Sequence, residues 1–136
     1  MSQATNLTAI ISIDNTEVGV AITDGLTLSE IHTGTSGVSG KSRKGGSSAR
    51  RYERNRESEL NTYYHRAAKL SNTILLPYID RIVSLVVSGP SFTKEEFLKH
   101  EYLDYRLRQK SLTLVGIEYS GLEGLYQTRS RLTEMT

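Results

Sequence analysis

Hydrophobic and polar residues follow one another along the first part of this chain in the patterns of β-strands. Residues 7–13 are rich in β-branched and apolar side chains, which predicts a buried strand. Val18, Val20 and Ile22 occupy every second position of 17–23, which predicts a second strand. Residues 26–31 suggest a third, less regular strand. Turn-forming pairs at 14–15 and 24–25 separate the three segments. They therefore predict an antiparallel meander.

A long helix is predicted next, before Pro77. Ser47 or Ser48 is suited to cap its first turn, because a serine hydroxyl accepts from the free N–H groups there. Pro77 is expected to end or bend the helix. Its apolar and small residues recur at three- and four-residue spacings and should face the sheet. They are Tyr52, Leu60, Tyr64, Ala67, Ala68, Ser71, Ile74 and Leu75.

The remaining residues predict two more strands between helices. The apolar run 82–88 is typical of a central strand covered on both faces. Residues 93–96 resemble a capping box that opens a helix, and a short helix is expected over 104–110. A strand over 111–119, a turn bracketed by Gly121 and Gly124, and a last helix through Leu125, Arg129 and Leu132 complete the order βββαβαβα. The fold class is α/β, with a mixed five-stranded sheet and flanking helices.

Composition fits one globular domain over 1–136. The 136 residues are 37% hydrophobic and 24% charged, and a chain of this length buries a core without disulfides. There is no cysteine, and the three histidines lack metal-ligand spacing, so we expect no bound metal or cofactor. The first residues do not resemble a signal peptide, and no apolar run is long enough to cross a membrane. A soluble cytoplasmic protein is expected.

Positive charge is concentrated in residues 41–56. This segment has seven Lys or Arg residues and one acid, Glu53, for a net charge of +6, whereas the whole chain carries +2. It overlaps a Gly- and Ser-rich stretch, 33–47, that is predicted to be a mobile loop within the domain. The basic residues are Lys41, Arg43, Lys44, Arg50, Arg51, Arg54 and Arg56.

A basic, glycine-tipped protrusion on a nearly neutral body suits a channel walled by phosphates, which predicts RNA binding. A flexible linker and a solvated helix face are the less specific interpretations. Cations clustered at a helix N-terminus argue against the solvated face, because they oppose the helix dipole unless a phosphate compensates.

Residues 45–54, Gly-Gly-Ser-Ser-Ala-Arg-Arg-Tyr-Glu-Arg, resemble the Gly-Gly-Gln-Ser-Ala-Arg-Arg-Phe-Glu-Arg motif of archaeal class I peptide chain release factors. Segments 87–90, 93–98, 102–103, 107–110 and 119–125 resemble the same family in the same order. The likeness spans about residues 7–135 and is to the central domain of that family alone.

The resemblance implies a sheet of ribonuclease H-like topology, with the Gly45-Gly46 loop at the tip of the long helix. In the family this tip enters the peptidyl-transferase centre, where water hydrolyses the ester of peptidyl-tRNA. Gly45 and Gly46 would let the backbone approach the tRNA 3′ end, and a backbone N–H would stabilise the developing oxyanion. The implied partners are the ribosome, through its large-subunit RNA, and peptidyl-tRNA. The resemblance implies no membrane partner. It implies a GTPase partner only if a C-terminal domain exists.

Ser47 stands where the family has glutamine, whose side chain narrows the pocket so that water enters and bulkier nucleophiles do not. Serine is shorter, so we expect peptide release to be weakened or lost. Three interpretations stay open. Ser47 marks a paralogue that occupies the ribosome without hydrolysis, a deliberate inactivating substitution, or a variant whose water is held by backbone groups.

Two other functions compete with peptide release. A non-catalytic ribosome-binding protein of rescue or dormancy is the alternative, by analogy with the Pelota branch, whose central domain lacks the Gly-Gly-Gln motif. A magnesium-dependent nuclease would use Asp14 and Glu118 near strand ends. No convincing third carboxylate joins them, and Asp14-Asn15 is a natural turn pair.

Overall fold

The computed structural model describes residues 6–37 and 49–135. No helix within these ranges is long and apolar enough to span a membrane. The strands are β1 (Leu7–Ile13), β2 (Glu17–Thr23), β3 (Leu28–Thr35), β4 (Ile82–Gly89) and β5 (Ser111–Gly116). The helices are α1 (Ala49–Leu75), α2 (Thr93–Lys99), α3 (Tyr105–Arg108) and α4 (Gly121–Met135), with a short 3-10 helix, Leu76–Tyr78, directly after α1.

All five strands form one mixed sheet in the order β3-β2-β1-β4-β5. The first three strands are antiparallel neighbours, which confirms the predicted meander. β4 runs parallel to both β1 and β5. The carboxyl ends of β1 and β4 therefore meet at the same edge of the sheet.

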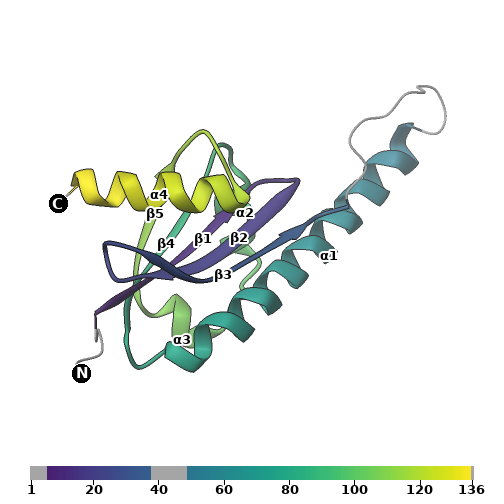
Figure 1. The fold of residues 1–136 in the computed structure, drawn as a ribbon. Coiled ribbons are helices and arrows are strands. Elements are labelled where there is room, and N and C mark those ends of the chain that lie inside the picture. Colours follow the sequence, from purple (N-terminus) through teal and green to yellow (C-terminus); the bar gives the residue numbers. More distant parts are fainter. Residues whose placement is uncertain (1–5, 38–48, 136) are drawn as a thin grey trace.

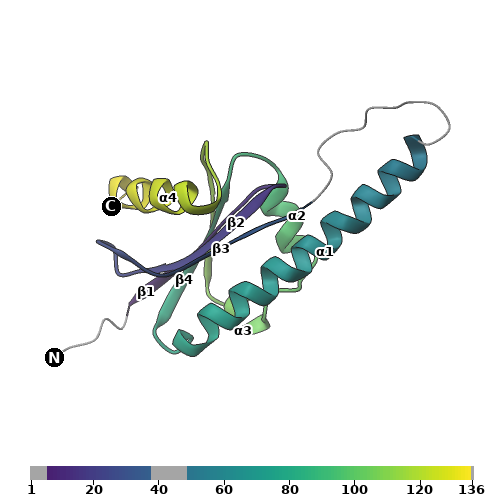
Figure 2. The same ribbon diagram turned by 45° about the vertical axis from the view of Figure 1, so that its right-hand side comes forward.

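Helices cover both faces of this sheet, with α1 on one and α4 on the other (Figures 1 and 2). Alternate residues of β1 face opposite layers, as the period of a strand requires. Ile11 and Ile13 belong to the core under α1, whereas Ile10 packs with Leu125 of α4. The apolar residues of β4 divide in the same way, which confirms a strand covered on both faces.

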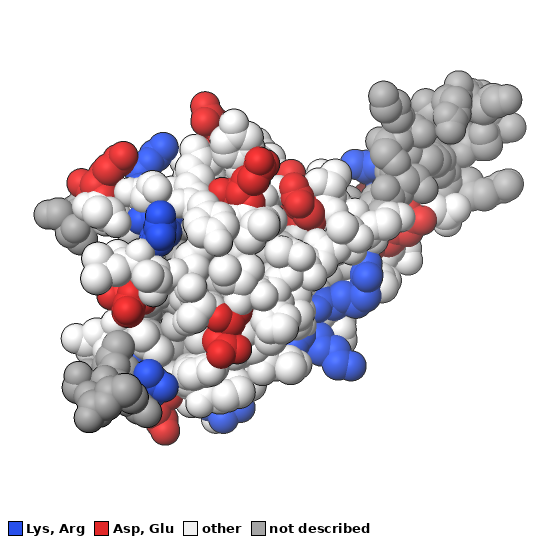
Figure 3. Space-filling model, viewed as in Figure 1, with Lys and Arg blue, Asp and Glu red and all other residues white. Residues whose placement is uncertain are grey.

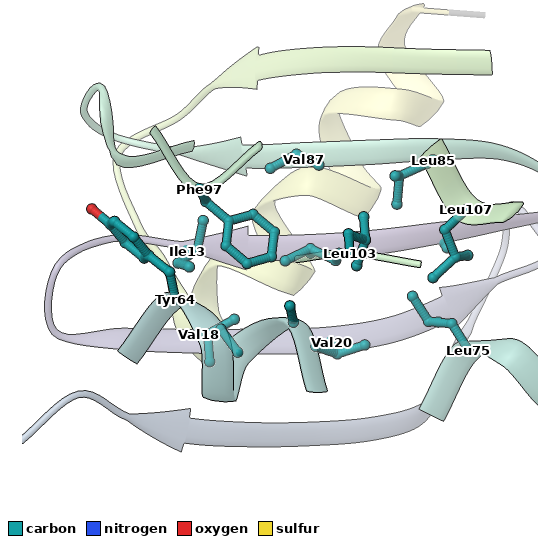
Figure 4. Packing of buried hydrophobic residues seen from close by; sticks show 14 of the residues in the cluster. Ile13, Val18, Val20, Tyr64, Leu75, Leu85, Val87, Phe97, Leu103 and Leu107 are labelled. Carbon is teal, nitrogen blue, oxygen red and sulfur yellow. The ribbon is translucent and has the colours of Figure 1, made fainter. Parts of the chain in front are cut away.

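The face of α1 that packs into the core is the face that the residue spacing predicted. Tyr64, Ala67, Ala68 and Leu75 are buried there, while the side chain of Tyr52 lies outside the described part. Figure 4 shows Tyr64 and Leu75 on α1 beside apolar residues of the strands and of the segment after β4. Pro77 lies in the 3-10 helix that follows α1, so the helix ends where the proline predicts.

Backbone contact between β2 and α4 is unusually close. A Cβ atom on Gly19 would lie 2.6 Å from the carbonyl oxygen and 2.8 Å from the carbonyl carbon of Gly121. Gly124 packs against Ser12 in the same manner. One turn on, the hydroxyls of Ser88 and Thr128 are hydrogen-bonded at 2.7 Å. Small residues at these positions let α4 lie directly on the sheet.

Replacing Gly19 with alanine should lower the free energy of unfolding by about 1–3 kcal/mol, because the methyl group would force α4 away from β2. Urea denaturation followed by circular dichroism measures the change. Gly116→Ala in β5 is the matched control, since a Cβ there meets no atom within 4 Å. Equal midpoints for the two variants would contradict the close packing.

Two boundaries near β3 differ from the prediction. Leu26 lies in a turn and is 80% exposed, because the carboxylate of Asp24 accepts from the N–H groups of Leu26 and Thr27 at 2.9 and 3.0 Å. At its other end β3 continues to Thr35, inside the stretch predicted as loop, by pairing with β2. Residues 38–48 of that loop, with both candidate capping serines, lie outside the described residues.

The predicted capping box at 93–96 is wrong. Phe92 occupies the N-cap position without a side-chain hydrogen bond, and Thr93 is the first helical residue. The Thr93 hydroxyl instead donates to Oδ1 of Asn15 at 2.7 Å, a partner distant in sequence. The side chain that does cap a helix is Asp104, which accepts from the backbone N–H of Arg106. The helix α3, Tyr105–Arg108, is therefore shorter than the predicted helix 104–110 at both ends.

β5 ends at Gly116, before the predicted end at residue 119. Gly116 is the partner of the last residue of β4, Gly89, so the ladder has no further strand to pair with. Beyond it, Oε1 of Gln127 accepts from the N–H groups of Glu118 and Tyr119, both at 3.2 Å. A side chain of α4 thus takes the hydrogen bonds that a longer strand would have made. The predicted turn between Gly121 and Gly124 is wrong, because α4 already begins at Gly121.

Candidate functional site

Most of the predicted site lies outside the described residues. Nothing is described for Lys41, Arg43, Lys44, Gly45, Gly46 or Ser47. Arg50 and Arg51 lie in the first turns of α1, where the backbone alone is described. Of the predicted basic residues, Arg54 is exposed and Arg56 is half-buried on the same helix.

The N-terminal half of α1 projects from the body. The helix has 27 residues, and no residue from Arg54 to Thr62 is buried, whereas Tyr63 is 1% exposed. At a rise of 1.5 Å per residue, Ala49 lies about 20 Å along the axis from Tyr63. Figures 1 and 2 show this part of the helix extending past the edge of the sheet. The first turns of α1 therefore lie at the far end of this projection.

Three hydrogen bonds hold α1 where it leaves the body. The hydroxyl of Tyr63 donates to the carbonyl of Asp14 at 2.8 Å, in the turn after β1. Nη2 of Arg66 donates to the carbonyl of Ser36 at 2.8 Å, just beyond β3. On a third side, the hydroxyl of Tyr102 donates to Oδ1 of Asn61 at 2.6 Å. The base of the projection is therefore fixed on several sides.

Tyr63 was missed by the sequence analysis, although it is among the largest fully buried side chains. Its position four residues before Ala67 places it on the same helix face, and that spacing was the available signal. Burial raises the pKa of the Tyr63 phenol strongly, and the nearby charge of Asp14 adds to the effect. The phenol therefore stays protonated and keeps its hydrogen bond.

Charge on the described part of α1 is mixed. Figure 3 shows Lys and Arg side chains along one flank of the helix, with acidic side chains nearer its beginning. Glu57 and Glu59 follow directly after Arg54 and Arg56. The excess of positive charge in the sequence therefore lies in residues 41–51, which precede α1 and include its first residues.

The carboxylate of Asp14 stabilises the turn between β1 and β2. Its Oδ1 accepts from the N–H and hydroxyl of Thr16, both at 2.8 Å, and from the N–H of Glu17 at 3.0 Å. Burial opposes ionisation of Asp14, but these hydrogen bonds outweigh it and lower the pKa of the carboxyl. Oε1 of Glu118 accepts from Nε2 of Gln127. Among residues 6–37 and 49–135, no group of three or more His, Cys, Asp or Glu residues is placed to hold a metal.

Comparison with known proteins gives consistent matches over this chain. The family model of eRF1 domain 2 matches residues 7–134. Peptide chain release factor subunit 1 of Archaeoglobus fulgidus is 37% identical over 121 residues, and that of Thermococcus sibiricus 36% over 128 residues. These matches cover 89% and 93% of this chain but 30% and 31% of the relatives, so the chain spans less than a third of their length.

Solved structures give the same fold. The archaeal translation termination factor aRF1 has a TM-score of 0.78 at 23% identity, over 98% of this chain and 38% of that one. Pelota of Archaeoglobus fulgidus has a TM-score of 0.54 at 18% identity, over 92% of this chain and 31% of its own. The mixed sheet and its flanking helices are thus shared with both proteins.

Proposed function

Since the chain belongs to the family of eRF1 domain 2, the central domain of peptide chain release factors, we propose that it carries the loop before α1 into the peptidyl-transferase centre of the large ribosomal subunit. The projection of α1 is the observation that supports this most directly. A helix held at Tyr63, with no buried residue from Arg54 to Thr62, suits insertion into a narrow channel.

The proposed reaction is hydrolysis of the peptidyl-tRNA ester by water. Gly45 and Gly46 approach the tRNA 3′ end through their backbone, since neither carries a Cβ. A backbone N–H there stabilises the oxyanion, a contribution of about 3 kcal/mol in acyl-transfer sites. Ser47 leaves the pocket less filled than glutamine does, and it weakens or abolishes the reaction. Lys and Arg residues around the loop hold RNA phosphates and position the loop.

Ribosome association should depend on salt and on Arg54. Arg54→Glu is expected to weaken binding to large ribosomal subunits and to lower the slope of log affinity against log salt by about one. The reason is that the variant loses a phosphate contact and places a negative charge beside the phosphates. Co-sedimentation with purified large subunits at several salt concentrations measures both quantities.

Lys69→Glu is the matched control. Lys69 is also exposed on α1, about 20 Å further along the helix axis than Arg54, at the end that remains with the body. The same charge reversal there should leave binding unchanged. Binding that is insensitive to salt, or that falls equally in both variants, would refute the proposed contact with ribosomal RNA.

Ser47 favours a second candidate function, a ribosome-binding protein of rescue or dormancy that occupies the site without hydrolysis. A ribosome-bound archaeal Pelota has the same fold at a TM-score of 0.57 and 21% identity. The two functions share the ribosome contact and differ in peptide release alone, so a release measurement separates them.

A further inference from the structure

A groove of about 540 Å³ lies between α1 and the segment that joins β4 to α2. Leu60 and Tyr64 of α1 form one side, and Asn15 and Phe92 follow the carboxyl ends of β1 and β4. β1 and β4 are parallel neighbours, yet the chain leaves β1 toward β2 and β4 toward β5. Such a divergence opens the crevice in which α/β sheets commonly bind ligands.

Hydrogen bonds within the chain hold the walls of this groove, so its shape does not depend on a bound ligand. The hydroxyl of Thr93 donates to Oδ1 of Asn15 at 2.7 Å, which ties α2 to the turn after β1. The ammonium of Lys94 donates to the carbonyl of Ser91 at 2.7 Å and so braces the segment that carries Phe92. The groove is therefore preformed in the free chain.

Aromatic surface is available in the groove. Phe92 is 81% exposed, although the chain's other phenylalanine, Phe97, is 2% exposed in the core. The ring of Tyr64 packs edge-on against Phe97 at 6.3 Å and lies 5.3 Å from the His100 ring, between centroids. Figure 4 shows the Tyr64 hydroxyl pointing away from the core. Phe92 thus offers a ring face that the described chain leaves open.

Two acidic residues line the groove from different elements, Glu57 from α1 and Glu96 from α2. Glu57 makes no ion pair with any residue in the described ranges. Glu96 lies 3.5 Å from the ammonium of Lys99, but these side chains are 50% and 75% exposed, so the pair is weak. The ammonium of Lys94 is engaged by Ser91, and Arg56 has an interaction of its own.

We propose that this groove binds an arginine of a partner protein, presented beside an apolar residue in an extended segment. The guanidinium stacks on Phe92 and pairs with Glu57 and Glu96, while the apolar neighbour covers Leu60. Arginine fits better than lysine, because its planar fork stacks on a ring and donates to two carboxylates. RNA is the poorer occupant, since both carboxylates repel phosphate. This contact is independent of peptide hydrolysis.

Two end-blocked tetrapeptides test the proposal, Gly-Arg-Leu-Gly and its analogue with neutral citrulline in place of arginine. Titrated into the isotopically labelled chain, the arginine peptide should shift the NMR signals of Phe92 and Tyr64 and saturate at millimolar concentration. The citrulline peptide should not. Glu57→Gln should weaken binding about tenfold, as expected for the loss of a charged hydrogen bond.

Glu59→Gln is the matched control, because Glu59 lies on the same helix and does not line the groove. Phe92→Ala should abolish the shifts and leave the fold intact, since the ring is exposed. Equal binding of both peptides, no shift by either peptide, or equal weakening by Glu57→Gln and Glu59→Gln would overturn the proposal. So would a single-stranded oligouridine that shifts Phe92 and binds more tightly to Glu57→Gln.

Discussion

Replacing Ser47 with glutamine is expected to raise the rate of peptide release from ribosome-bound peptidyl-tRNA by at least about tenfold, or about 1.4 kcal/mol in activation free energy. In the proposed function, the longer amide side chain would fill the pocket beside the tRNA 3′ end and leave room for water alone. Release of labelled formyl-methionine, with both proteins at saturating concentration, measures the change.

Ser48→Gln is the control, because it adds the same side chain one residue further along and should not raise the rate. If the Ser47→Gln chain alone releases peptide, the domain reaches the catalytic centre and Ser47 limits its activity. Equal rates for the wild type and Ser47→Gln would refute the role given to residue 47. Salt-sensitive ribosome binding without release by either protein would instead establish the non-catalytic function.

Truncating Phe97 to alanine should lower the free energy of unfolding by about 3–5 kcal/mol. Phe97 is 2% exposed and belongs to the core cluster under α1, beside Tyr64 and Leu103. Its removal opens a cavity between α2 and α1, the helix that projects from the body. Urea denaturation should show a lower midpoint with an unchanged m-value, since the surface exposed on unfolding is nearly the same.

Phe92→Ala removes an identical side chain five residues earlier in the chain. Because Phe92 is 81% exposed, its loss should change stability by no more than about 0.5 kcal/mol. The two variants together test whether Phe97 of α2 is buried while Phe92, at the N-cap position before the helix, is exposed. A comparable loss of stability in both would contradict the arrangement of that helix.

Much of the fold followed from local patterns. Alternation over 17–23 corresponds to β2, because residues on one face of a strand recur with a period of two. The near-continuous apolar run 82–88 corresponds to β4, because that strand is covered on both faces. The helix spacing through Leu75 and the proline at 77 gave the end of α1 correctly. Each of these features depends on neighbouring residues, so it is visible in one sequence.

Features that depend on distant partners were predicted less well. Thr93 looked like a helix cap because the residues that follow it suit one, yet its hydroxyl bonds to Asn15. β5 looked longer because its sequence continues to favour a strand, but β4 offers no partner beyond Gly89. In both cases a contact made across the fold outweighed a local preference worth a fraction of a kcal/mol.

The sequence by itself determined the family, the order of the elements and the position of the basic Gly45-Gly46 segment, because these depend on residue identity along the chain. Tertiary structure alone decided that α1 leaves the body at Tyr63, since the partner that holds this tyrosine, Asp14, is 49 residues away. It also brought Asn15, Glu57 and Phe92 to one groove. Contacts between distant segments arise when helices and strands pack, and no local pattern specifies them.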